Sequence, residues 1–276
     1  MRLEFEATSA RHPAARADAP AAIDGLTLRI ARGEPVAVIG PSGAGKTTLL
    51  HLAAAALKPS AGKVHIDGQD PWTLPTSDLQ RLRGRLFLAP QVPPLPPRQR
   101  VVTAVLAARL PAMSLAASLR SLFYPDDIAG AHAALQRFDL ADKLFERVDR
   151  LSGGVRQRIG LARALLSPAS LWLIDEPLSA LDPKRARQAI AALVDEAAAR
   201  GVTLVATLHQ VDVALERFPR IVGLKAGRVA FDLPAHEVGR ELLANLYGDE
   251  FEQLDALAVA PIDEPATAPP AVMHCR

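Results

Sequence analysis

Apolar and polar residues alternate in several short stretches near the start of the chain, and they predict half-buried strands. The apolar positions are Leu3, Phe5 and Ala7, then Leu26, Leu28 and Ile30, then Val64 and Ile66. Such alternation is typical of a sheet that covers the core with one face only.

Three continuous apolar runs predict strands that are buried on both faces: PVAVIG (35–40), LWLID (171–175) and TLVATLH (203–209). Long helical patterns lie between them. The clearest helix begins after Asp182 as N-cap, with Pro183 in its first position, and ends before Gly201. This alternation indicates a parallel sheet with helices on its faces. Residues 220–233 predict a closing hairpin that turns at Ala226 and Gly227.

Residues 92–167 differ, because their pattern is helical without a strand, and they predict an inserted helical subdomain. This segment opens with VPPLPPRQR, which we interpret as a stiff linker rather than a polyproline ligand. Residues 251–276 are rich in Pro and Ala and predict a disordered tail. Residues 1–250 are then one large domain.

Composition narrows the class of protein. The chain has 276 residues with 49% hydrophobic residues and a formal net charge of +2, so charge gives no case for nucleic acid or an anionic membrane. Its single cysteine excludes a disulfide within the chain, which fits a reducing compartment. Arg109 and Pro111 interrupt the longest apolar stretch, and Glu4 and Glu6 speak against a signal peptide. We expect a cytoplasmic protein that reaches a membrane only by docking onto a partner.

The motif GPSGAGKTT follows the first buried strand and precedes a helix with Leu49, Leu50, Ala53, Ala56 and Leu57 on one face. It consists of Gly40, Pro41, Ser42, Gly43, Ala44, Gly45, Lys46, Thr47 and Thr48. Its glycines let backbone N–H groups surround phosphates at the positive end of the helix. Lys46 adds a charge at the β- and γ-phosphates, and Thr47 offers a hydroxyl to Mg²⁺. Kinases, GTPases and ATPases all use this motif.

Polar residues end the other predicted strands. Asp175 and Glu176 close LWLID, where a buried carboxylate needs a partner such as Mg²⁺. We expect Asp175 to hold Mg²⁺ and Glu176 to orient or deprotonate the attacking water. His209 ends the next strand and is expected to contact the γ-phosphate. Gln91 ends RLFLAPQ, and its amide is a candidate bridge between Mg²⁺ or water and the helical subdomain.

Ser152, Gly153 and Gly154 come directly before an apolar helix and predict a second anion site. A serine alone would cap the helix, so two glycines argue for close approach of a ligand to the backbone. The loop Gly40–Thr48 already accounts for one nucleotide. We therefore expect this element to close over the nucleotide of a second copy of the chain.

Together these motifs resemble the ATP-binding subunit of an ABC transporter. The matching motifs are Walker A (Gly40–Thr47), the Q-loop glutamine Gln91, the signature Leu151–Gly154, Walker B (Leu171–Asp175) with Glu176, the D-loop Ser179–Asp182 and the switch histidine His209. The resemblance implies a P-loop NTPase fold with a mostly parallel core sheet, an antiparallel β-subdomain and the inserted helical subdomain. It also implies a head-to-tail dimer that binds ATP and Mg²⁺ between one chain's Walker motifs and the other's signature.

Finer features are similar to the phosphonate-importing subfamily: TLHQVDVAL around His209, and the segment from SLFYPDD to the signature. They imply import of phosphonate or a related phosphorus oxyanion. The expected partners are a permease dimer at the cytoplasmic face of the inner membrane and, indirectly, a periplasmic solute-binding protein, without nucleic acid. Three alternatives stay open: an importer of another small solute, an accessory ATPase of phosphonate metabolism, and a P-loop kinase of small molecules.

Two positions depart from the family pattern. The signature usually continues with glutamine, where this chain has Val155, and we expect this change to tune activity without abolishing it. The family also stacks an aromatic residue on adenine from a loop after the first strand. His12 is the nearest match in that loop and is expected to stack more weakly.

Overall fold

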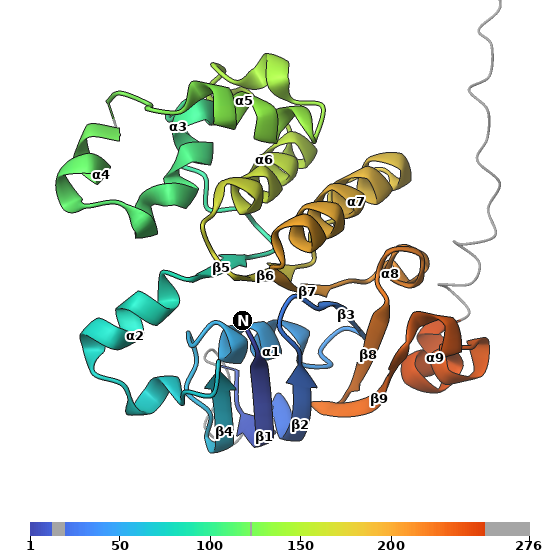
Figure 1. Cartoon of the computed structure of the whole chain (residues 1–276). Coiled ribbons are helices and arrows are strands. Elements are labelled where there is room, and N and C mark those ends of the chain that lie inside the picture. The colour runs from blue at the N-terminus through green and yellow to red at the C-terminus, as the bar shows by residue number, and fades with distance from the viewer. Residues whose placement is uncertain (13–19, 122, 252–276) are drawn as a thin grey trace, which may run out of the picture.

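Two sheets and the helices around them form the fold in the computed structural model, which describes residues 1–12, 20–121 and 123–251 (Figure 1). The larger sheet has six strands in the order β5-β6-β7-β3-β8-β9. These strands are β5 (Leu86–Ala89), β6 (Leu171–Asp175), β7 (Thr203–Thr207), β3 (Pro35–Ile39), β8 (Arg220–Lys225) and β9 (Arg228–Pro234). All neighbours from β5 to β8 are parallel and only β9 is antiparallel, so the predicted mostly parallel sheet is confirmed.

The smaller sheet is antiparallel, with β1 (Leu3–Ala10) between β2 (Ile23–Ile30) and β4 (Ala61–Ile66). Its predicted alternation is confirmed from Leu26 to Ile30 but is wrong at Ala7. A break in register after Phe5 turns Ala7 outward with φ 43°, and Thr8 takes the buried position instead. A bulge of this kind shifts every later side chain to the other face.

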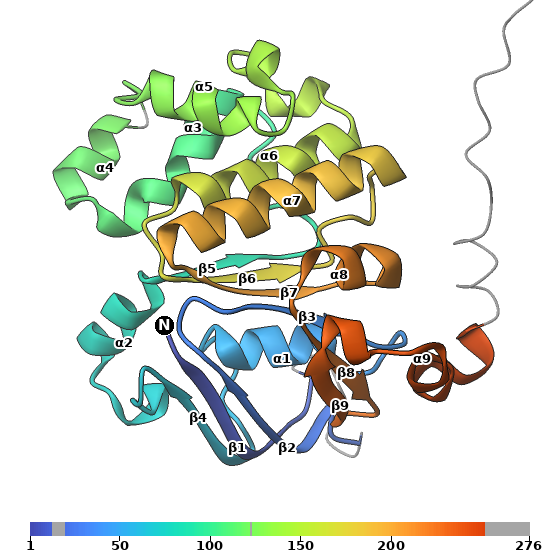
Figure 2. The ribbon, with the colours of Figure 1, turned by 45° about the vertical axis from the view of Figure 1, so that its right-hand side comes forward.

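Helices cover both faces of the core sheet (Figure 2). The helices that pack on or near the sheets are α1 (Lys46–Ala53), α2 (Thr76–Arg83), α6 (Gly153–Leu166), α7 (Pro183–Arg200), α8 (Val211–Arg217) and α9 (Arg240–Tyr247). Helix α1 lies between the two sheets, where Leu49, Leu50 and Leu52 share one apolar cluster with strands of both. Helices α6 and α7 lie side by side over the opposite face.

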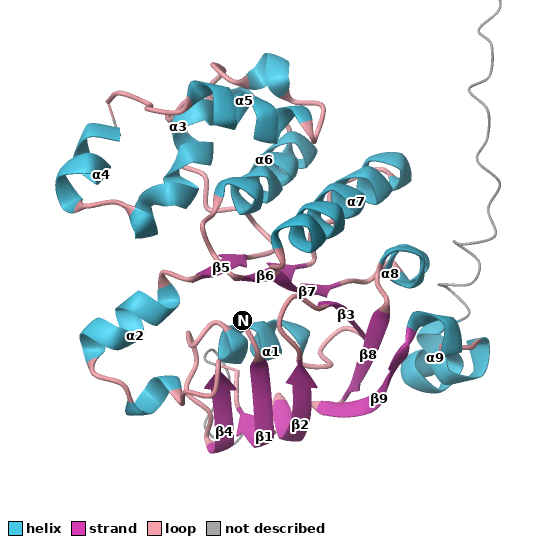
Figure 3. Cartoon of the chain, in the orientation of Figure 1, coloured by secondary structure: helices cyan, strands magenta, loops and turns pink. Residues whose placement is uncertain are grey.

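The described residues between 92 and 167 contain helices and no strand (Figure 3). Besides α6 they form α3 (Val101–Leu106), α4 (Leu115–Ser121) and α5 (Ile128–Gln136). The limits of this subdomain stay a prediction. Of the predicted disordered tail 251–276, only Phe251 is described, and the rest lies outside the described residues. None of the described helices is long and apolar enough to span a membrane.

Caps and turns decide where the elements end. Asp182 accepts a hydrogen bond from the Arg185 N–H at 3.0 Å and Gly201 ends α7 with φ 62°, as predicted. The predicted hairpin is β8–β9, and it turns at Ala226 and Gly227, both with positive φ.

Two predicted elements are too long. Ala55 turns into the left-handed region with φ 50°, so α1 ends at Ala53 and Ala56 and Leu57 lie beyond it. Strand β7 ends at Thr207, two residues before His209, because the chain then turns into α8.

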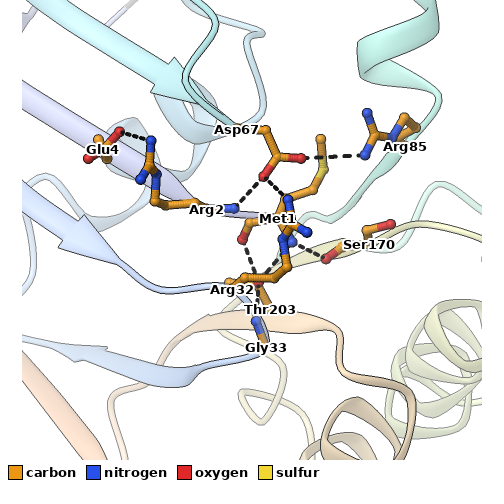
Figure 4. A network of polar contacts seen from close by, with 9 residues as sticks. All are labelled: Met1, Arg2, Glu4, Arg32, Gly33, Asp67, Arg85, Ser170 and Thr203. Carbon is orange, nitrogen blue, oxygen red and sulfur yellow. Dashed lines mark hydrogen bonds and ion pairs between the residues drawn. The ribbon is translucent and has the colours of Figure 1, made fainter.

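A polar network joins the start of β1 to both sheets (Figure 4). The Thr203 hydroxyl, at the start of β7, accepts from the Met1 nitrogen at 3.1 Å and from Gly33 at 2.9 Å. Asp67 accepts from the Arg2 N–H at 2.8 Å and from Arg32 at 3.2 Å. Burial alone would raise the pKa of Asp67, but these hydrogen bonds outweigh it and hold the pKa below its ordinary value.

Candidate functional site

The loop from Gly40 to Gly45 leaves β3 and enters α1 in a conformation that only glycine permits at two places. A Cβ on Gly40, with φ 152°, would lie 2.1 Å from the Leu224 carbonyl oxygen. A Cβ on Gly45, with φ 102°, would lie 2.2 Å from the Ala22 carbonyl oxygen. The loop therefore packs directly on neighbouring backbone. It presents the N-terminus of α1, where backbone N–H groups favour an anion.

Lys46 is 4% exposed and donates to two carbonyls of the same loop, Gly40 at 2.8 Å and Pro41 at 3.1 Å. Its Nζ also lies 3.9 Å from a carboxylate oxygen of Glu176. Burial lowers the pKa of Lys46, and the carboxylates of Glu176 and Asp175 partly offset this effect. The ammonium group of Lys46 therefore lies inside the loop Gly40–Gly45, where a bound phosphate would contact it.

Asp175 ends β6 inside the sheet with both carboxylate oxygens engaged. The Thr47 hydroxyl donates to Oδ2 at 2.9 Å and the Thr207 hydroxyl donates to Oδ1 at 2.7 Å. Thr207 in turn accepts from the Glu176 N–H at 3.0 Å. This chain of contacts joins the ends of β6 and β7 to the first turn of α1, where the sequence predicts one metal site.

Glu176 has φ 44°, an unusual backbone conformation for a residue with a side chain, and such strain gathers at functional sites. This turn directs its carboxylate to three donors. Gln91 Nε2 donates to one oxygen at 2.8 Å, and His209 Nε2 lies 2.6 Å from the other, which Lys46 also approaches. Gln91, His209 and Lys46, predicted from separate parts of the chain, therefore gather around one carboxylate.

Ser152 caps α6, accepting from the Val155 N–H at 3.4 Å, which is the role that a serine alone would fill, while the predicted anion site stays a prediction. Ser152 and Gly153 are exposed. A Cβ on Gly153 would meet no atom within 4 Å, whereas one on Gly154 would lie 2.7 Å from the Ala180 carbonyl oxygen. Gly154 therefore packs against the segment between β6 and α7. An exposed helix N-terminus with free space before it is open to a ligand from outside the chain.

His12 is exposed in the loop after β1. This loop returns to the phosphate cradle, because Ala22 donates to Ala10 at 2.8 Å and its carbonyl lies against Gly45. His12 thus belongs to a loop with one end at the cradle, while a contact with adenine stays a prediction.

Comparison with known proteins matches this sequence to one family. The family model described as "ABC transporter" matches residues 23–179. The phosphonates import ATP-binding protein PhnC of Polaromonas sp. is 63% identical over 100% of both chains. A PhnC of Pseudomonas aeruginosa strain UCBPP-PA14 is 58% identical over 91% of this chain and 93% of that one. The chain belongs to the ABC transporter family.

The fold agrees with a solved relative of this ABC subunit, the dimeric ATP-binding cassette MJ0796 in a post-hydrolysis state bound to ADP and Pi. That chain is 27% identical and superposes with a TM-score of 0.71, over 84% of this chain and 98% of its own length. The predicted P-loop NTPase fold is confirmed, and the protein is an ATP-binding subunit and an ATPase.

Two residues of this ABC subunit's site were not predicted from the sequence. Thr207 holds both Asp175 and Glu176, and its position at the end of a buried strand beside them was the available signal. Tyr247 accepts from the Gly40 N–H at 3.1 Å. No sequence signal links it to a loop that lies 207 positions away.

Proposed function

We propose that the protein is the nucleotide-binding subunit of an importer for phosphonate or a related phosphorus oxyanion. Identity to PhnC of Polaromonas sp. over the whole of both chains carries this proposal. The subunit acts at the cytoplasmic face of the inner membrane on a permease dimer, which receives substrate from a periplasmic solute-binding protein. Helices of residues 92–167 serve as the surface toward the permease.

The proposed reaction is hydrolysis of ATP between two copies of the chain. Lys46 and the backbone of Gly40–Thr48 bind the phosphates, and Ser152–Gly154 of the second copy close over them. The Glu176 carboxylate accepts a proton from water as the water oxygen attacks the γ-phosphorus, and ADP leaves. His209 and Gln91 sense the γ-phosphate, because both already contact Glu176.

Mg²⁺ fits the residues at this site. Thr47, Asp175 and Gln91 offer the hydroxyl, carboxylate and carbonyl oxygens that Mg²⁺ prefers. Mg²⁺ at such a site takes its remaining ligands from phosphate and water. When bound, Mg²⁺ would neutralise phosphate charge that develops during hydrolysis.

Lys46, His209 and Gln91 all contact the Glu176 carboxylate. A γ-phosphate would attract Lys46 and His209 as well, so it would compete with this carboxylate for both residues.

Growth on phosphonate as the sole phosphorus source tests the transported substrate. In a strain without another importer, deletion of the gene should abolish growth on phosphonate and leave growth on phosphate normal. Normal phosphonate uptake by the deletion strain would contradict transport. Uptake retained together with co-purification of a lyase complex instead of a permease would favour an accessory ATPase.

A further inference from the structure

We propose that Tyr247 is a positioning residue for nucleotide binding, because its hydroxyl fixes the first residue of the phosphate-binding loop and, through it, Lys46. Tyr247 is the last residue of α9 and lies far along the sequence from every motif of the site. The inference rests on the proposed binding of ATP at this loop and adds a residue to that site.

Gly40 is held from both sides. Its N–H donates to the Tyr247 hydroxyl at 3.1 Å, and its carbonyl accepts from Lys46 Nζ at 2.8 Å. The peptide groups on the two sides of one residue therefore have fixed orientations. The Tyr247 hydroxyl fixes the peptide group before Gly40, and Lys46 donates to the peptide group after it. The hydroxyl therefore acts on Lys46 through Gly40 alone.

The loop needs an acceptor at this point. Strand β3 ends at Ile39, so the Gly40 N–H has left the ladder of the sheet, and it is buried. A buried N–H without an acceptor is strongly disfavoured. The Leu224 carbonyl lies too close to admit a side chain on Gly40, which limits how the loop can rearrange if the acceptor is lost.

Helix α9 is docked firmly enough to serve as this anchor. Leu243, Leu246 and Tyr247 are buried in the core cluster, and Lys225 at the end of β8 donates to the Asn245 carbonyl. Burial raises the pKa of Tyr247 to about 12, so the hydroxyl stays neutral near pH 7 and accepts from the Gly40 N–H as a neutral group. Burial lowers the pKa of Lys46, and the negative charge of Glu250, just beyond α9, is one of three carboxylates that partly offset this effect.

The test is Tyr247→Phe in the full chain, which keeps the ring and removes only the acceptor oxygen. Tyr124→Phe is a matched control, because Tyr124 is the only other tyrosine and is 71% exposed. We expect Tyr247→Phe to weaken ATP binding and to raise KM for ATP by about 5- to 10-fold, the effect of one hydrogen bond, with kcat within about twofold. Tyr124→Phe should match the unsubstituted protein.

Lys46→Met separates positioning from a structural role. If Tyr247 acts through Lys46, adding Tyr247→Phe to Lys46→Met should leave ATP affinity unchanged, measured by calorimetry at millimolar ATP. Equal weakening in both backgrounds would overturn the inference. A lower melting temperature with unchanged KM would also overturn it. Failure of the unsubstituted protein to bind ATP would refute the proposed function, a result distinct from either.

Discussion

Gly153→Asp separates folding of one chain from assembly of the site across two chains. A Cβ at Gly153 meets no atom within 4 Å, and the residue is exposed in the first turn of α6. A carboxylate in the first turn of a helix stabilises it by about 0.3–1 kcal/mol. The single chain should therefore fold with an unchanged or slightly higher melting temperature and should bind ATP at its own Lys46.

The dimer should not tolerate the same carboxylate, because we propose that this helix end faces the partner's ATP. Two like charges about 4 Å apart repel by about 4 kcal/mol at an effective dielectric constant of about 20, roughly a thousandfold in an equilibrium. We predict at least a hundredfold loss of phosphate release. Gly153→Ala, which adds no charge, should lose less than about tenfold. Phosphate release by Gly153→Asp within about fivefold of normal would refute the idea that the signature faces a phosphate.

Three further predictions follow from the site and its surroundings. Glu176→Gln should lower phosphate release by about a hundredfold or more and preserve ATP affinity in a binding titration, whereas normal turnover would remove Glu176 from catalysis. Val155→Gln should change the activation free energy of ATP hydrolysis by about 1 kcal/mol, the scale of one net hydrogen bond, and a several hundredfold change in rate would refute this expectation. In Tyr124→Phe, ultraviolet absorbance should show Tyr247 ionising near pH 12 instead of the ordinary 10.0. Because the unfolded chain loses this proton first, the free energy of unfolding should fall between these pH values, by up to about 3 kcal/mol, and a midpoint near 10 would contradict the burial of Tyr247.

The buried strands were predictable because long apolar runs have few other solutions, and β3, β6 and β7 all lie within the runs that predict them. The irregularities and ends of the elements were less predictable. The bulge at Ala7 and the turn at Ala55 depend on backbone conformations that alanine rarely adopts, so composition gives no warning of them.

Much of the candidate site was predictable because parallel strands bring their carboxyl ends to one edge. This rule alone brings Gln91, Asp175, Glu176 and His209 toward Lys46. It does not reveal that the Glu176 carboxylate would contact Gln91, His209 and Lys46 at once, because that arrangement depends on the left-handed backbone of Glu176. Tyr247 was unpredictable for a different reason, since α9 packs near the loop only through tertiary contacts.

The central claim is that the signature of one chain completes the ATP site of another. Light scattering of Glu176→Gln, with and without ATP, tests it most directly, because slow hydrolysis preserves the ATP-bound form. We predict that ATP doubles the mass of Glu176→Gln and that adding Gly153→Asp to the same chain abolishes the doubling while ATP still binds. A single-chain mass with ATP bound to Glu176→Gln, or a doubling that survives Gly153→Asp, would contradict the claim.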